Sequence, residues 1–401
     1  MTKVLRLGEV AEVGAGNSAP QNEGLFKGGT LPFVRTSDVG AIHIGGIESS
    51  RDLLTPEGAK GLKLFPAGTI LFPKSGASTF LNHRVILNIP TYVSSHLATI
   101  KANNGVALDR YIFYFLQTVD ARDLCQDQAY PSLNRDQIAG IKVPLPSLDE
   151  QQRIVEKIDK AFTEIELAQS HLGERRDSYS LLEESFIDER LSQNRESFTS
   201  KKLSDITSKI GSGATPRGGE ESYKSEGISL IRSLNVYDDG FREKKLAFID
   251  EVQAKALANV EIKSGDVLLN VTGASIARTC IAPQEYLPAR VNQHVSIIRP
   301  KPEIISTEYL HFLLRSQRMK SSLLGVGNSG GSTRQALTKV DLENTIIEFP
   351  LDLEIQKEAV DELKSFRDLS QTYMNNLRKL ESLYSDLQNS LLISELSGSV
   401  I

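Results

Sequence analysis

The stretch FVRTSDV at residues 33–39 has a counterpart, LIRSLNV, at residues 230–236, 197 positions later. The same offset relates PAGTIL at 66–71 to KSGDVL at 263–268, and GAS at 76–78 to GAS at 273–275. HLATI at 96–100 and Tyr111 match HVSII at 294–298 and Tyr309 at an offset of 198. Because the order is kept over nearly the whole repeat, the chain carries an internal duplication, with the drift in offset placed in loops.

The first part of each repeat, about 150 residues long, mixes short β-type runs with Gly, Pro, Asn and Ser. Examples are residues 69–72 and 85–87 in the first repeat, and 267–269 and 295–298 in the second. A helical pattern follows late in each repeat, at 109–118 and 307–316. This pattern predicts two similar α+β globules with irregular sheets.

The second part of each repeat, 148–192 and 352–396, is a proline-free stretch of 45 residues. PSLDEQQ at 146–152 and PLDLEIQ at 350–356 open these stretches at an offset of 204, with acidic residues in the first turn that favour a helix start. Apolar residues recur every seven positions, which is typical of a coiled-coil seam; they are Ile158, Ile165, Leu172, Tyr179 and Phe186, and then Phe366, Tyr373, Leu380 and Leu387.

We therefore expect two long antiparallel coiled-coil helices, each about 65–70 Å long, that separate the two globules around a pseudo-two-fold axis. The expected boundaries are 1–147 for the first globule, 148–196 for the first helix, 197–350 for the second globule and 351–401 for the second helix. A protein of this form is suited to reading two separated patches on one DNA duplex. Because the two globules differ in sequence, we expect the two half-sites to differ as well.

Charge is segregated along the chain, although the net charge is −5. The two globular stretches carry net charges of +2 and +3, whereas the connecting stretches carry −6 and −4. An acidic total therefore does not exclude DNA binding by basic faces of the globules.

Several classes of chemistry lack their motifs. The chain has no GxxxxGK[ST] loop, no amino-methyltransferase tetrapeptide and no HExxH. Its two cysteines, Cys125 and Cys280, form no CxxC, and no apolar run is long enough for a membrane span. We therefore expect a non-enzymatic cytoplasmic binding protein without a metal site, a bound cofactor or a membrane segment.

The chain resembles the specificity subunits of type I restriction-modification enzymes over its whole length. The resemblance rests on LGEVAEVG at 7–14 and LSDITSKIGSGATP at 203–216, on GISLIR at 227–232 and SGDVLLNVTGAS at 264–275, and on NQH at 292–294 and PLPSLDEQQRI at 144–154. The first repeat departs from the pattern with NSAP at 17–20 and VSSH at 93–96, and the second long helix has EIQ at 354–356 in place of EQQ.

The resemblance implies two target-recognition domains that read a bipartite, asymmetric site in double-stranded DNA. It implies partners as well: two modification subunits, which bind S-adenosylmethionine and methylate adenine, and restriction subunits, which use ATP and Mg²⁺. This chain would supply the sequence recognition and none of the catalysis.

Polar loops beside strands are the natural place for base and phosphate contacts. On that ground we expect DNA contacts from Arg35, Thr36, Lys74, Ser75, Ser78, His83 and Arg84 in the first domain. In the second domain we expect them from Thr215, Arg217, Arg232, Asn235, Thr272, Ser275, Arg278, Asn292 and Arg334. At matched positions such as Arg35 and Arg232 a scaffold role is equally open, and His96 and His294 are interpreted as structural.

Two alternatives stay open at this point. The chain could serve as the DNA-specificity partner of a fused nuclease-methyltransferase or another phage-defence system. It could also be a coiled-coil scaffold that never touches DNA, in which case it would show no salt-dependent DNA affinity.

Overall fold

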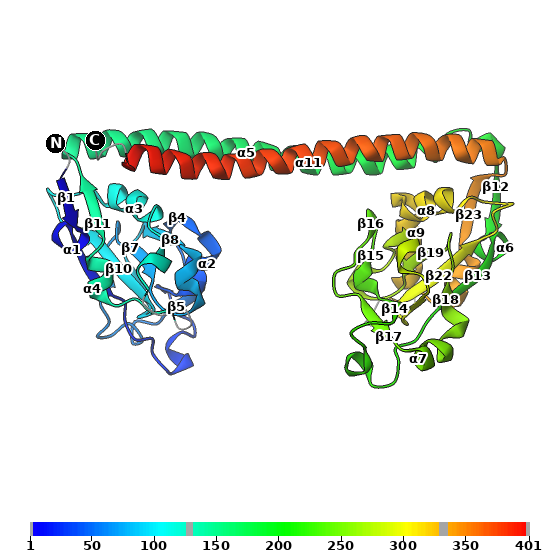
Figure 1. The fold of residues 1–401 in the computed structure, drawn as a ribbon, viewed down its shortest axis with the longest axis horizontal. Coiled ribbons are helices and arrows are strands. Elements are labelled where there is room, and N and C mark those ends of the chain that lie inside the picture. The colour runs from blue at the N-terminus through cyan, green and yellow to red at the C-terminus, as the bar shows by residue number, and fades with distance from the viewer. Residues whose placement is uncertain (1–2, 126–130, 329–335, 398–401) are drawn as a thin grey trace. The chain divides into compact units, whose positions relative to one another are not determined.

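The computed structural model describes residues 3–125, 131–328 and 336–397, which form two compact units (Figure 1). The first unit comprises residues 1–173 and 378–401, and the second comprises residues 174–377. Each unit holds one of the predicted globules together with one half of each long helix. Each is described below by itself.

The globule of the first unit contains strands and short helices in the order β1 (Lys3–Arg6), α1 (Leu7–Val10), β2 (Ala11–Ala15), β3 (Leu31–Val34), α2 (Thr36–Ile42), β4 (Ile44–Ile47), β5 (Asp52–Leu54), β6 (Leu64–Phe65), β7 (Ile70–Pro73), β8 (Arg84–Leu87), β9 (Thr91–Val93), β10 (Leu97–Ala102), α3 (Asp109–Gln117), α4 (Arg135–Ala139) and β11 (Lys142–Leu145). Its described strands form sheets ordered β2-β10-β7-β8-β4, β5-β3-β9-β6 and β1-β11.

The globule of the second unit contains β12 (Phe198–Lys202), α6 (Leu203–Ile206), β13 (Thr207–Ser212), β14 (Ile228–Ile231), β15 (Val236–Tyr237), β16 (Gly240–Phe241), β17 (Ala247–Ile249), α7 (Glu251–Ala256), β18 (Glu261–Ile262), β19 (Val267–Asn270), β20 (Thr279–Ile281), β21 (Ala289–Val291), β22 (Val295–Pro300), α8 (Thr307–Arg315), α9 (Gln317–Asn328), α10 (Lys339–Asn344) and β23 (Ile346–Pro350). Its sheets are ordered β13-β22-β19-β20, β17-β14-β21-β18, β12-β23 and β15-β16.

The two globules share one topology, as the internal duplication predicts. The order β2-β10-β7-β8 matches β13-β22-β19-β20, and β5-β3-β9-β6 matches β17-β14-β21-β18. In each second sheet the central pair is parallel, β3 with β9 and β14 with β21, while its outer strands run antiparallel to them. The expected α+β globules with irregular sheets are therefore confirmed.

The long helices are α5 (Leu148–Arg190) and α11 (Leu353–Ser397). A glutamine near the start of each fixes the helix to its globule. Buried Gln151 accepts a hydrogen bond from Leu108 N and donates to the carbonyls of Val106 and Pro146. Gln356 makes the same set of bonds with Ser306 N, Ile304 O and Pro350 O.

This equivalence corrects the alignment of the two helix starts. The sequence comparison matched Gln152 with Gln356, but the structural counterpart is Gln151, at an offset of 205. Gln152 is exposed and bonds only to Glu156 on its own helix. One residue turns a helix by about 100°, so only Gln151 can reach the globule.

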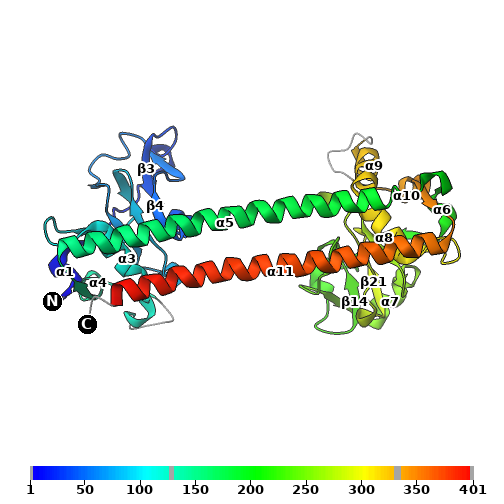
Figure 2. The same ribbon diagram turned by 90° about the horizontal axis from the view of Figure 1, so that it is seen from above.

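Within each unit α5 and α11 lie side by side and antiparallel (Figure 2). In the first unit Lys157 near the start of α5 pairs with Glu395 near the end of α11, at 2.6 Å. In the second unit Arg190 at the end of α5 pairs with Glu362 in the first part of α11, at 2.5 Å. Phe366 stacks on Phe186 there, with ring centroids 4.2 Å apart.

The seam of α11 departs from the predicted heptads in its later half. Leu380 and Leu387, which the heptads place in the seam, are 41% and 52% exposed, whereas Leu392 is buried. A straight α-helix has 3.6 residues per turn rather than 3.5, so a strict seven-residue series rotates out of the contact after a few turns. The prediction was wrong for these two leucines for that reason.

A continuous core joins each globule to its helices. In the first unit buried residues of β2, β7 and β10 pack on α3, and α3 packs under the long helices through residues such as Ile158 and Leu392 (Figure 1). In the second unit α8 takes the same place, with Tyr309 matching Tyr111 and both almost fully buried. No helix in the described residues is both long and apolar enough to cross a membrane.

Candidate nucleic-acid interface

In the first globule the loops after β2, β3 and β7 meet the turn between β9 and β10. Gly16 N donates to Leu97 O at 3.1 Å, Ser94 N to Val34 O at 2.9 Å, and Lys74 N to His96 O at 3.1 Å. These backbone bonds fix the polar loop residues of three strand ends on one surface. We call it the first loop surface; it comprises residues 16–20, 35–36, 74–78 and 93–96.

The second globule builds the same surface from equivalent segments. Gly213 N donates to Asn292 O at 3.1 Å, Asn292 N to Ile231 O at 3.1 Å, and Val271 N to His294 O at 3.0 Å. We call it the second loop surface; it comprises residues 213–217, 232–235, 271–275 and 292–294. The close approach of the loops requires glycine, because a Cβ on Gly213 would lie 1.6 Å from Val291 O.

Arg35 and Arg232 occupy equivalent positions, and internal partners hold both side chains. Arg35 pairs with Asp52, and its guanidinium lies 5.2 Å from the Phe33 ring centroid. Arg232 pairs with Glu220 at 2.8 Å, donates to Lys245 O at 2.6 Å, and has a side chain only 11% exposed. This geometry favours the scaffold role at Arg232 over a direct base contact.

Three further residues expected to contact DNA are buried. Arg84 is 0% exposed and stacks on Phe72, with 3.4 Å from its guanidinium carbon to the ring centroid; burial lowers the pKa of Arg84 to about 9. Asn235 accepts from Arg232 N and donates to Arg242 O, and Asn292 accepts from His294 N. All three side chains are therefore held inside the globules.

The remaining expected residues of the first domain lie on or beside the first loop surface and are at least partly exposed. Thr36 begins α2, Lys74, Ser75 and Ser78 follow β7, and His83 precedes β8. The His83 ring stacks on the His43 ring with centroids 4.3 Å apart. Burial, together with His43 and Arg84, lowers the pKa of His83, so a neutral imidazole is presented at neutral pH.

In the second domain Thr215, Arg217, Thr272, Ser275 and Arg278 are partly or fully exposed. The strand pairings β7–β8 and β19–β20 make Arg278 the structural counterpart of His83. Its guanidinium lies 4.8 Å from the Tyr237 ring centroid, and that of Arg242 lies 4.9 Å from it. Arg334 lies outside the described residues.

Sequence reasoning missed Tyr237, Arg242, His43 and Gln293. The first three belong to the stacked groups just described, and no sequence motif marks such stacks. Gln293 is exposed and accepts a hydrogen bond from Thr215 across two loops. The NQH stretch at 292–294 was visible in the sequence, but only the convergence of the loops gives its glutamine a partner.

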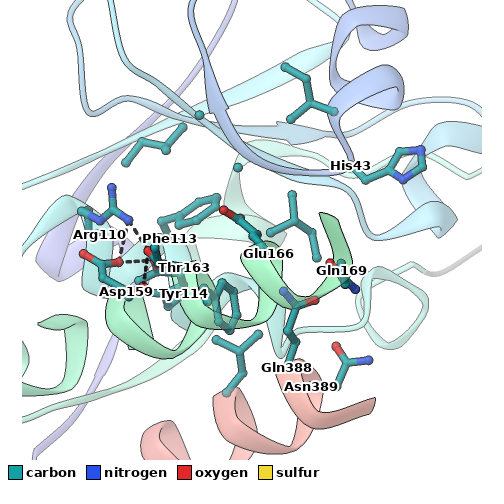
Figure 3. A pocket seen from close by; sticks show the side chains of 17 residues that line it. His43, Arg110, Phe113, Tyr114, Asp159, Thr163, Glu166, Gln169, Gln388 and Asn389 are labelled. Atoms are coloured by element: carbon teal, nitrogen blue, oxygen red, sulfur yellow. Dashed lines mark hydrogen bonds and ion pairs between the residues drawn. The ribbon is translucent and has the colours of Figure 1, made fainter. Parts of the chain in front are cut away.

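A pocket of about 650 Å³ lies in the first unit between β4, α3 and the two long helices (Figure 3). Its polar centre is a network in which Arg110 pairs with Asp159 at 2.6 Å and Tyr114 donates to the same carboxylate. Burial and the Asp159 bond raise the pKa of Tyr114 to about 12. The network ties α3 to α5.

No group of three or more His, Cys, Asp or Glu side chains suited to a metal occurs in the part of the chain that the structure describes.

Comparison with known proteins agrees with this organisation. The family described as the type I restriction modification DNA specificity domain matches residues 2–174 and again residues 195–382. The chain belongs to this family. It is a type I specificity protein with two DNA specificity domains, and the family's role is DNA sequence recognition rather than catalysis.

Relatives and solved structures support the assignment along the whole chain. The type I restriction enzyme MjaIX specificity subunit of Methanocaldococcus jannaschii is 22% identical over 376 residues, covering 88% of this chain and 84% of that protein. A chain from a solved type I R-M system superposes with a TM-score of 0.72 at 19% identity, covering 98% and 97%. The HsdS subunit from Thermoanaerobacter tengcongensis gives 0.54 at 18%, covering 99% and 97%; these two structures establish the fold.

Proposed function

We propose that this type I specificity protein reads a bipartite, asymmetric site in double-stranded DNA, each half-site meeting one loop surface. The observation that carries the proposal is the duplication itself. Two globules of one topology present equivalent loop surfaces whose accessible side chains differ, such as Ser95 against Gln293, and beside these surfaces the partly exposed His83 is matched by Arg278. One scaffold with two sets of polar groups suits two unlike half-sites.

The domain limits that accompany this proposal are 1–147 and 197–350 for the two target-recognition domains, with 148–196 and 351–401 as spacer helices. The contacts in the first domain would come from Arg35, Thr36, Lys74, Ser75, Ser78 and His83. Those in the second would come from Thr215, Arg217, Thr272, Ser275, Arg278 and Arg334. Arg84, Arg232, Asn235 and Asn292 would act by shaping these loops.

The protein would work in the cytoplasm with two modification subunits and with restriction subunits. S-adenosylmethionine, ATP and Mg²⁺ would bind to those partners, and this chain would catalyse no reaction. A helical partner has a suitable contact on α11, where Leu380, Leu383 and Leu387 follow helical spacing on one face and are 41%, 59% and 52% exposed.

Selection from a random DNA library tests the proposal. The full chain, purified with its modification subunits, is expected to enrich two short unlike motifs at a fixed separation, with an affinity that falls steeply as salt rises. Modification subunits without this chain provide the control and should enrich no such pair. A complex that binds every library member equally, or shows no salt-dependent DNA affinity, would contradict the proposal and favour a scaffold.

A further inference from the structure

Each loop surface contains a hydroxyl–imidazole pair at the same structural position. In the first domain Ser75 Oγ lies 2.8 Å from His96 Nδ1. In the second domain Thr272 Oγ1 lies 2.6 Å from His294 Nδ1. Both hydroxyl groups follow an inner strand of a sheet, β7 or β19, and both histidines precede its neighbour, β10 or β22.

In the second domain the hydrogen positions follow from the partners. Thr215 donates to Gln293 Oε1, so the Gln293 amide nitrogen faces His294 Nε2, 3.0 Å away, and donates to it. His294 then carries its hydrogen on Nδ1 and donates to Thr272 Oγ1. Among the described residues two donors are left without a partner: the hydroxyl hydrogen of Thr272 and the second amide hydrogen of Gln293.

The first domain reaches the same result with fewer groups. Within the described residues His96 Nε2 has no hydrogen-bond partner, and the His96 side chain is exposed. If Nδ1 donates to Ser75, the Ser75 hydroxyl hydrogen is free; if Ser75 donates to Nδ1, the hydrogen on Nε2 is free. Either tautomer leaves one donor without a partner among the described residues.

The pairs are not needed to join the loops, because backbone bonds already do so. Lys74 N donates to His96 O in the first domain, and Val271 N donates to His294 O in the second. The loops after β7 and β19 also form isolated β-bridges, Ser75 with Ser132 and Thr272 with Ala336. The backbone bonds therefore hold the loops together, and each side-chain pair can offer a hydrogen bond to a ligand.

The features that the two domains share indicate which ligand these donors bind. Two domains that read different bases still meet the same sugar-phosphate backbone, so features repeated on both loop surfaces suit the backbone and features that differ suit the bases. A phosphate oxygen accepts hydrogen bonds only, and each pair can supply the donor that it needs.

We propose that Ser75–His96 and Thr272–His294 are equivalent phosphate-binding pairs, which set the position of each domain on its half-site without reading sequence, and that Gln293 supplements the second pair. This inference rests on the proposed DNA-reading function. It also reverses the sequence-based interpretation of His96 and His294 as purely structural residues.

Single-phosphate neutralisation provides the test. The full chain with its modification subunits is bound to its target duplex, in which one phosphate at a time is replaced by methylphosphonate. We expect one position in the half-site of the second domain to lose about tenfold in affinity, as for a hydrogen bond to a charged group. Thr272→Val should lower the affinity for natural DNA about tenfold. On DNA that carries methylphosphonate at that one position, the substitution should cause no further loss of affinity. The preference for each base of the site should stay unchanged.

Controls separate the possible causes. Thr272→Ser keeps the hydroxyl group and should restore both affinity and the methylphosphonate effect. The double substitution Ser75→Ala with His96→Ala, which removes the free donor of either tautomer, should repeat the Thr272→Val result in the other half-site. If the affinity loss from Thr272→Val adds to the loss from methylphosphonate at every phosphate position, the inference is overturned. A changed preference at one base, or a lowered melting temperature with an unchanged phosphate profile, would overturn it as well. A wild-type complex without any preferred sequence would instead refute the proposed function.

Discussion

Substitution of buried His311 by phenylalanine should remove a pH-dependent component of stability from the second unit. His311 lies in α8, is 5% exposed, and places Nε2 3.4 Å from Thr279 O. The internal repeat supplies the substitution, because Phe113 occupies the equivalent buried position in α3. The phenylalanine ring is therefore compatible with this place in the fold.

Burial is the largest cause that lowers the pKa of His311, to about 4; nearby Arg315 and Arg367 lower it too, while Thr279 O and Asp238 oppose the shift. An unfolded histidine has a pKa of about 6.5, so between pH 6.5 and 4 the unfolded chain binds more protons than the folded chain. Stability is then retained above pH 6.5 and lost as pH falls. Linkage gives a loss of about 3 kcal/mol between pH 7 and pH 4.

Urea denaturation of the full chain, followed by circular dichroism from pH 4 to pH 8, measures this effect. The difference in unfolding free energy between wild type and His311→Phe should be constant above pH 7 and should shift by about 3 kcal/mol in favour of the variant by pH 4. Carboxylates common to both proteins cancel in the difference. A difference that stays constant over the whole range would refute the reasoning.

Three further predictions concern the long helices. Gln356→Ala should lower the unfolding free energy by about 2–3 kcal/mol in urea titrations, because three backbone groups lose their partner; Gln151→Ala should match it and exposed Gln152→Ala should change little. Phe366→Ala should cost about 3 kcal/mol in the same assay by removing the ring stacked on Phe186, and an unchanged midpoint would contradict that stacking. Inserting one heptad into both helices should lengthen the unspecified spacer by roughly three base pairs, since seven residues add about 10 Å; an unaltered spacer in methyladenine mapping would count against the helices as its ruler.

Much of the fold follows from residues visible in the sequence. Proline-free heptads predicted α5 and α11, and the matched Tyr111 and Tyr309 located the helix that joins each globule to them. These signals depend on local periodicity, which packing preserves. The later seam of α11 could not be located in the same way, because the accumulated rotation of the helix decides whether a leucine such as Leu380 faces inward.

The candidate site was less accessible to sequence reasoning. The sequence places Arg84 next to polar residues just before an apolar run, where an arginine is expected to reach phosphate, yet Arg84 begins β8 and stacks on Phe72. Side chains that are distant in sequence form the buried space that Arg84 fills, so the sequence around Arg84 does not reveal it. Gln293, by contrast, is an exposed residue that the sequence did not single out, because its hydrogen bond comes from Thr215, 78 residues away. Only tertiary contacts distinguish a loop residue that shapes the surface from one that faces the ligand.

Genome-wide mapping of methyladenine in cells that express the full chain with its methyltransferase partner tests the central claim most directly. We expect one methylated motif composed of two unlike half-sites with a constant number of unspecified bases between them, absent from cells that express the partner alone. A single uninterrupted motif, two identical half-sites, or methylation independent of this chain would contradict the view that two unlike loop surfaces read one DNA site.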